Sequence, residues 1–298
     1  MSHDETHTHA EAKGLPYFTF TVSTALQLGA ALAIFYWVAP EAFLAEFSRP
    51  WLIVMWTALF GLPMSLFEYL YHRYLLHSAV LPFLGSMHKA HGHHHGLTNV
   101  KAAVKPGEPD QMVQVDSKYP IEHEHQEESM MFPLYAASIF YGMFTVLFGI
   151  PAILLFNGQP VVVSLLFAVT LCYAGYEIWH AIVHLPFERY WKPMMESRYF
   201  GKATKHAYGF HLMHHWRPTC NLAVVGLWGF AVWDHVFGTH RRPDRLPLQG
   251  ADVTFADAQL GRPRFPIAQF DKVGASWYKW SRKVEGALVR FFTRNKAH

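Results

Sequence analysis

The stretch VVVSLLFAVTLCYAGYEIWHAIVH, residues 161–184, joins an apolar segment to a pair of histidines. Val161–His180 contains a single charged residue, Glu177, and a helix needs about 20 mostly apolar residues to cross a bilayer. His180 and His184 are four residues apart, so they lie on one face of that helix. The stretch therefore predicts a membrane-spanning helix that ends in two candidate metal ligands.

Three further stretches are long and apolar enough to span a membrane. They are Tyr17–Ala39, Pro50–Phe67 with a continuation to His72, and Met130–Phe156. Half of the 298 residues are hydrophobic and only 16% are charged, whereas about a quarter of the residues in a soluble domain are charged. Short connections join the first two stretches and the last two. We therefore predict an all-α integral membrane protein with four transmembrane helices in two hairpins.

The predicted domains are a polar tail (1–16), a membrane-embedded domain (17–240), an irregular surface extension (241–275) and a basic amphipathic helix (276–298). Apolar residues of the last segment recur at three- and four-residue steps, and Lys and Arg occupy its other faces. Such a helix either lies on an anionic membrane surface or packs on the body of the protein. The apolar run Leu222–Trp233 is too short to span and is predicted to be a core or interfacial segment.

Charge predicts the orientation in the membrane and excludes one class of partner. The formal net charge is +3, and no run of Lys and Arg resembles a nucleic-acid site, so we expect no nucleic-acid partner. With four spans, every Lys and Arg except Arg49 falls on one side of the membrane. Positive residues concentrate on the cytoplasmic side. We therefore expect a cytoplasmic cap, at a bacterial inner membrane or the endoplasmic reticulum.

Most of the 21 histidines fall into four clusters with regular spacing. In chain order the spacings are H-x4-H, H-x2-H-H, H-x3-H and H-x2-H-H, given by His72, His77, His91, His94, His95, His180, His184, His211, His214 and His215. The second and fourth spans end on the same side, so all four clusters can converge there. Because one first-row metal ion takes about four to six ligands, ten imidazoles predict two ions.

Several other residues are weaker candidates for the same site. His72 and His77 lie about 140° apart on an ideal helix, so they need a helix end between them or two different ions to bind. His88, His93 and His206 are possible extra ligands, and Glu177 is a candidate to orient a ligand imidazole. His123 and His125 lie in a charged segment and are predicted to be solvated.

The order of the four histidine boxes, with paired spans before the first and third, resembles the fatty acid hydroxylase/sterol desaturase superfamily. A second match is NLAVVGLWGFAVWDHVFGTH, residues 221–240, which resembles that family's ending at Asn221, Trp233, Asp234, Phe237, Gly238 and Thr239. The resemblance covers about residues 20–240. It implies a catalytic domain in which the ten histidines are ligands, and Asp234 is a candidate to orient one of them.

The resemblance also implies a reaction. Two iron ions and O2 would hydroxylate a C–H bond of a lipid such as a fatty acyl chain, a sphingolipid or a sterol, and desaturation at the same site is the alternative. Zinc has no redox chemistry, so zinc in isolated protein would be a substitute. No cytochrome-type domain is fused to this sequence, so a separate electron donor is expected, ferredoxin-like or cytochrome b5-like with its reductase.

Two other functions are less compatible with the sequence. A zinc-dependent membrane hydrolase needs a general base beside the metal, as in H-E-x-x-H, and that motif is absent. A metal transporter binds its ion near the middle of the membrane, whereas these clusters lie at span ends and in loops.

Overall fold

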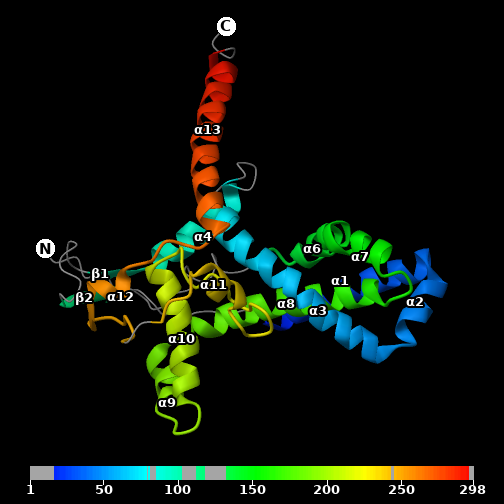
Figure 1. The fold of residues 1–298 in the computed structure, drawn as a ribbon, viewed down its shortest axis with the longest axis horizontal. Helices are drawn as coiled ribbons and strands as arrows, with labels where there is room; N and C mark the ends of the chain where they lie inside the picture. Colours follow the sequence, from blue (N-terminus) through cyan, green and yellow to red (C-terminus); the bar gives the residue numbers. More distant parts are fainter. Residues whose placement is uncertain are drawn as a thin grey trace, which may run out of the picture.

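The computed structural model describes residues 17–78, 80, 85–102, 112–117, 132–242 and 245–294. The N-terminal tail, His123 and His125 lie outside these residues. Among the described residues, four helical segments are long and apolar enough to cross a membrane: Tyr17–Val38, Pro50–Leu76, Ala136–Leu155 and Val161–Val183. They match the four predicted stretches and indicate an integral membrane protein. The spans gather at one end of the molecule and the histidine-bearing helices lie beside them (Figure 1).

The spans are built from several helices. They comprise α1 (Tyr17–Val38), α3 (Pro50–Tyr71) continued by the π-helix η1 (His72–Leu76), α6 (Ala136–Phe144) continued by η3 (Thr145–Gly149) and α7 (Ile150–Leu155), and α8 (Val161–Val183). A short helix, α2 (Pro40–Phe47), joins α1 to α3. Both α2 and α3 begin with proline, whose fixed φ and missing N–H suit the first helical position.

Helices α3 and α8 pack along each other at the centre of the spans. The Thr57 hydroxyl donates to Ser164 O (3.3 Å), and the Ser164 hydroxyl donates to Ile53 O (3.2 Å). At the start of α8, the buried Glu46 carboxylate accepts from the Val162 and Val163 amides. The first amides of a helix have no partner inside the helix, so Glu46 fixes this end of α8.

The remaining elements form a cap that carries six of the ten candidate ligands. They are α4 (Gly85–Leu97), β1 (Val100–Ala102), β2 (Met112–Ser117), η4 (Phe187–Trp191), α9 (Lys192–Met195), α10 (Gly201–Trp216), α11 (Val232–Phe237), β3 (Asp252–Thr254), α12 (Phe255–Ala258) and α13 (Ile267–Arg294). Trp191, Tyr208 and Leu212 are buried at its centre.

The cap differs from the prediction in two respects. The fold is mostly helical, but β1, β2 and β3 form a small antiparallel sheet in that order, so an all-α fold is wrong in this detail. Two of the three strands, β1 and β3, have only three residues, which is too short to show an alternating pattern. Helix α13 begins at Ile267, nine residues before its predicted start, and β3 and α12 lie in the segment expected to be irregular.

The apolar run Leu222–Trp233 packs against α3 rather than crossing the membrane. The Trp228 indole donates to Ala58 O (3.1 Å) and lies against Gly61, where a Cβ would collide with the ring. The Trp233 indole donates to the Ser65 hydroxyl (3.0 Å). Leu222 itself is fully buried. The run is therefore held along the second span and leads from the cap into the spans.

Candidate metal centre

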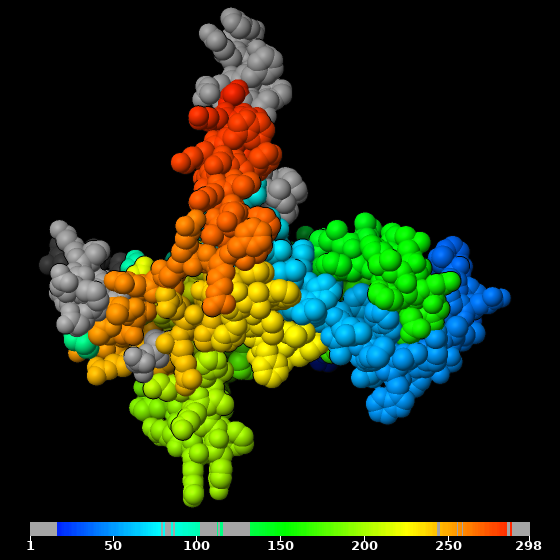
Figure 2. Space-filling model, viewed as in Figure 1, coloured from blue at the N-terminus to red at the C-terminus, as the bar shows by residue number. Residues whose placement is uncertain are grey.

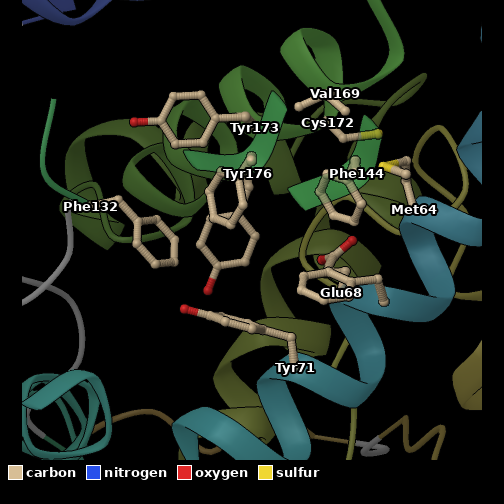
Figure 3. Close-up of a pocket in the computed structure, with 11 residues that line it drawn as sticks. Met64, Glu68, Tyr71, Phe132, Phe144, Val169, Cys172, Tyr173 and Tyr176 are labelled. Atoms are coloured by element: carbon tan, nitrogen blue, oxygen red, sulfur yellow. The ribbon is translucent and has the colours of Figure 1, made fainter. Parts of the chain in front are cut away.

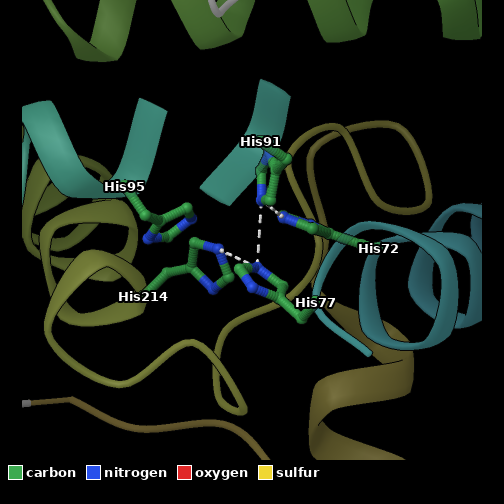
Figure 4. Close-up of side chains that lie close together, drawn as sticks. All are labelled: His72, His77, His91, His95 and His214. Carbon is green, nitrogen blue, oxygen red and sulfur yellow. Dashed lines mark hydrogen bonds between the residues drawn. The ribbon is translucent and has the colours of Figure 1, made fainter. Parts of the chain in front are cut away.

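The ten predicted ligands come together in two groups of five. The first group is His72, His77, His91, His95 and His214, and the second group is His94, His180, His184, His211 and His215. Within each group the ligand nitrogens lie within 4.8 Å of one another. Opposite ligands of an ion with bonds of about 2.1 Å are separated by about 4.2 Å. Each group can therefore hold one metal ion, as the first group shows (Figure 4).

The π-helix η1 explains how His72 and His77 belong to the same group. The amide of His77 donates to His72 O (3.1 Å), a bond that spans five residues in place of four. The wider turn brings both rings to one side, with centroids 5.0 Å apart. From the sequence, the two histidines needed a helix end between them or two different ions to bind. The structure confirms the helix end, because the helix ends at Leu76, and it adds that the last turn is widened.

Helices α4 and α10 each contribute to both groups. From α4, His91 and His95 belong to the first group and His94 to the second. From α10, His214 belongs to the first group and His211 and His215 to the second. The two groups adjoin, since the His95 and His215 rings stack with centroids 4.3 Å apart. The H-x2-H-H boxes therefore link the two groups, whereas each pair on α3–η1 or α8 serves one group.

Distances between ring nitrogens fit the coordination sphere of a metal ion. In the first group, His91 Nε2 lies 3.1 Å from His72 Nε2 and 3.0 Å from His77 Nε2. In the second, His211 Nε2 lies 3.1 Å from His184 Nε2 and 3.2 Å from His215 Nε2. With bonds of about 2.1 Å, neighbouring ligands are about 3.0 Å apart at octahedral angles and about 3.4 Å apart at tetrahedral ones. The spacing is closer to the octahedral value.

Three buried histidines need a partner that the described residues do not supply. Neither nitrogen of His94, His95 or His180 has a hydrogen-bond partner within the described part of the chain. A buried polar atom without a partner costs about 1–3 kcal/mol. A bound metal ion would satisfy one nitrogen of each ring.

Other ligands are held in the tautomer that a metal requires. His72 Nδ1–H donates to Leu222 O (2.6 Å), and His214 Nδ1–H donates to Cys220 O (2.8 Å). The Thr98 hydroxyl donates to His94 O, so its oxygen accepts from His215 Nδ1–H (3.0 Å). In each ring this tautomer leaves Nε2 unprotonated, as a metal ligand must be. Thr98 is a site residue that the sequence analysis missed, and its position four residues after His94 was the available signal.

Two carboxylates, on the buried Asp234 and the half-buried Glu68, hold the strap that carries two of these carbonyls. The strap, residues 220–226, has five successive amides bound to side chains. Asp234 accepts from the Leu222 and Ala223 amides. Glu68 accepts from the Val224, Val225 and Gly226 amides. Because Leu222 and Cys220 accept from ligands of the first group, the strap links these carboxylates to that group.

The structure corrects the predicted roles of Asp234 and Glu177. Asp234 binds two strap amides and the Thr239 hydroxyl (2.7 Å), so it orients His72 through the backbone and not by direct contact. Glu177 is buried and accepts from the Phe132 amide (3.1 Å) rather than from a ligand imidazole. Its position on the ligand-bearing helix suggested a contact with a ligand imidazole. Its carboxylate instead points toward the segment before α6.

The possible extra ligands lie outside both groups. His88 is half-buried, and its Nδ1–H donates to Leu76 O (2.6 Å). His93 is exposed on α4. His206 is exposed on α10, where its ring stacks on His240 with centroids 5.8 Å apart.

Electrostatics keep the ligand rings neutral. Burial, followed by the charges of neighbouring imidazoles, holds the pKa well below its usual value for the eight ligands outside the spans: His77, His91, His94, His95, His184, His211, His214 and His215. Only a neutral imidazole has a lone pair for a metal. These imidazoles can therefore bind a metal ion without first losing a proton.

Comparison of the chain with protein-family models, with curated proteins and with solved structures gave no match. The metal centre is therefore inferred from the residues of this chain and their geometry.

A matched pair of variants on α4 tests the grouping. His94→Ala removes a ligand of the second group, so we expect loss of about one of two bound ions, since His91 and His95 remain for the first group. His93→Ala, one residue away and exposed, should keep both ions. Metal analysis of the purified proteins measures this. Equal metal content in the two variants would contradict the grouping.

The strap predicts a selective effect of Asp234. In Asp234→Asn, an amide NH2 replaces one acceptor of the strap amides, so the Leu222 carbonyl and His72 should shift. We expect metal affinity to fall about 10–100-fold in the first group and to stay unchanged in the second, as measured by titration with a metal chelator. Asp252→Asn, at an exposed position on β3, is the control. A loss shared equally by both groups would argue for general destabilisation instead.

Proposed function

We propose that this chain is an integral-membrane di-iron oxidoreductase that uses O2 to hydroxylate a C–H bond of a lipid. The observation that carries the proposal is the pair of adjoining groups of five imidazoles at the ends of two apolar helices. The order of the histidine boxes supports membership of the fatty acid hydroxylase/sterol desaturase superfamily.

The donor set favours iron with redox chemistry over a zinc hydrolase. Imidazole suits both iron and zinc, but five nitrogens in each group exceed the four ligands that zinc usually takes. Within the described residues, both groups consist of histidine alone, so no carboxylate stands beside the ions as a general base. A transporter is also disfavoured, because the groups lie at the ends of α3 and α8 and not at their middle.

With two electrons from the donor and two protons, the bound iron pair would activate O2 so that one oxygen atom enters the C–H bond as a hydroxyl and the other leaves as water. The residues of this chain do the rest. The α3–η1 pair and the α8 pair bind from the spans, while α4 and α10 bind both ions at once. Leu222, Cys220 and Thr98 orient rings through Nδ1. The near-complete burial of the ligands excludes bulk water from the site.

A cavity between the spans supports a lipid as the substrate (Figure 3). It is lined by Met64, Phe67, Glu68 and Tyr71 from α3, Phe140 and Phe144 from α6, Val169, Cys172, Tyr173 and Tyr176 from α8, and Phe132. The one carboxylate among them, on Glu68, is occupied by the strap amides. An apolar chain therefore fits this cavity better than a polar molecule.

Two residues that line the cavity are neighbours of metal ligands, one for each group. Tyr71 is followed directly by His72 of the first group. The Tyr176 ring lies 5.6 Å from the ring of His180 of the second group. A chain in the cavity would thus reach the site from within the bilayer. Desaturation is the second candidate reaction, because the same cavity would decide whether one or two hydrogens leave the chain.

Two further features belong to the proposal. The concentration of basic residues on one side favours a cytoplasmic catalytic cap, to which a separate ferredoxin-like or cytochrome b5-like donor and its reductase would deliver electrons. Zinc found in isolated protein would be a substitute for iron.

The reaction is tested with a defined lipid, ¹⁸O2 and an added electron-donor system. We expect one labelled oxygen in the product, detected by mass spectrometry, and no product when the donor is omitted. Loss of two hydrogens without label would identify a desaturase. Turnover without O2 would rule out both reactions.

The cavity is tested by filling it. Val169 is 2% exposed and Leu171, on the same helix, is 53% exposed. We expect Val169→Trp to lower kcat/KM for a long-chain lipid at least about tenfold, because overpacking displaces the chain, while metal content is kept. Leu171→Trp is the matched control. Val169→Ala, which enlarges the cavity, should shift the preferred chain length. Unchanged kinetics in both Val169 variants would contradict the assignment.

A further inference from the structure

The beginning of helix α13 lies against the body of the protein, and the rest of the helix projects away from it (Figure 2). It is 28 residues long, which corresponds to about 42 Å. Its direction is transverse to the spans (Figure 1). Ile267 and Ser281 are buried, and Gly274 lies close to Tyr74 and Val80. One face of the helix thus rests on the end of the second span.

The anchor of α13 fixes its depth relative to the bilayer. Arg73 donates through Nε and Nη2 to the two carboxylate oxygens of Asp271, at 2.8 and 2.7 Å. The Tyr74 hydroxyl donates to Asp271 Oδ1 (2.9 Å), and the Trp277 indole donates to Val80 O (2.7 Å). Arg73 lies in the last turn of the span Pro50–Leu76. The start of helix α13 is therefore held at the depth in the bilayer where this span ends. Because the helix runs transverse to the spans, the rest of it stays at about the same depth.

A second face of α13 is apolar and open. Val273, Trp277, Trp280 and Val284 recur at steps of four, three and four residues, so they form one stripe along the helix. Their exposed fractions are 66%, 43%, 54% and 37%. Tryptophan is enriched where the bilayer meets water. The stripe has the chemistry of a surface that is covered by lipid.

Basic residues adjoin this stripe. Helix α13 contains six Lys or Arg residues and two acidic ones, and Asp271 is already paired with Arg73. Lys272, Lys279, Arg282 and Lys283 are exposed. Anionic head groups attract such residues, each contributing about 1 kcal/mol near a membrane surface. Two copies of α13 facing each other would instead bring like charges together.

We propose that α13 lies in the interfacial layer of the bilayer, with its apolar stripe in the acyl chains and its basic residues at anionic head groups. The sequence allowed this helix either to pack on the protein or to lie on the membrane surface, and the proposal combines the two. The face with Ile267 and Gly274 packs on the protein, and the stripe faces lipid. The assignment depends on the spans and on α13, and not on the proposed oxidoreductase activity.

Spin labels on the full chain test this assignment. Labels are placed at Val284→Cys in the stripe and at Lys279→Cys outside it, in a Cys172→Ala background, because Cys220 is fully buried. Each protein is reconstituted in phosphatidylcholine vesicles with or without phosphatidylglycerol. In the vesicles with phosphatidylglycerol, we expect the Val284→Cys label to collide with O2 but not with a water-soluble nickel chelate. The Lys279→Cys label should show the reverse.

Three outcomes would overturn the proposal. Access of the nickel chelate to both labels would place α13 in water. Shielding of the Val284→Cys label from both reagents, with spin–spin broadening, would identify a second copy of the chain as the occupant. Identical collision rates in the two vesicle compositions would exclude the role of anionic head groups.

Discussion

Ten imidazoles buried together, nearly all of them shielded from water, impose the requirement that the rest of this structure meets. Each ring has a lone pair that must find a hydrogen or a metal, and each unpaired buried nitrogen costs about 1–3 kcal/mol. The free energy of unfolding of a whole protein is only about 5–15 kcal/mol. His94, His95 and His180 have no partner for either nitrogen among the described residues. Two metal ions would meet this need and explain why the rings lie with Nε2 atoms 3.0–3.2 Å apart.

The scaffold directs these rings with elements of different kinds. Helix α8 ends at Val183, so His184 caps it and stays beside His180. The second span widens into a π-helix, and α4 and α10 each carry ligands of both groups. The strap is held by Glu68 and Asp234, which satisfy five successive amides that have no secondary structure to bind. Irregular backbone beside a membrane span is stable only when such partners exist, so the carboxylates stabilise the strap and the ligands it orients.

The sequence predicted the features that depend on local pattern. Long apolar runs identified the four spans, and four-residue spacing put His180 and His184 on one face. Features that depend on tertiary contacts were not predictable. The turn at His72 needs a π-helix, which no residue in HRYLL signals. The division of each H-x2-H-H box between two groups depends on how α4 and α10 pack against the other ligand-bearing elements. Glu177 and Asp234 were expected beside ligands, but their carboxylates bind backbone amides, and only the fold brings those amides near.

The claim that each group holds one ion is tested most directly by diffraction from crystals of anaerobically purified protein at wavelengths on either side of the iron absorption edge. The account predicts two anomalous peaks per chain that vanish below the edge. One should lie among His72, His77, His91, His95 and His214, and the other among His94, His180, His184, His211 and His215. A single peak, peaks outside these groups, or no iron signal in protein that is active would contradict it.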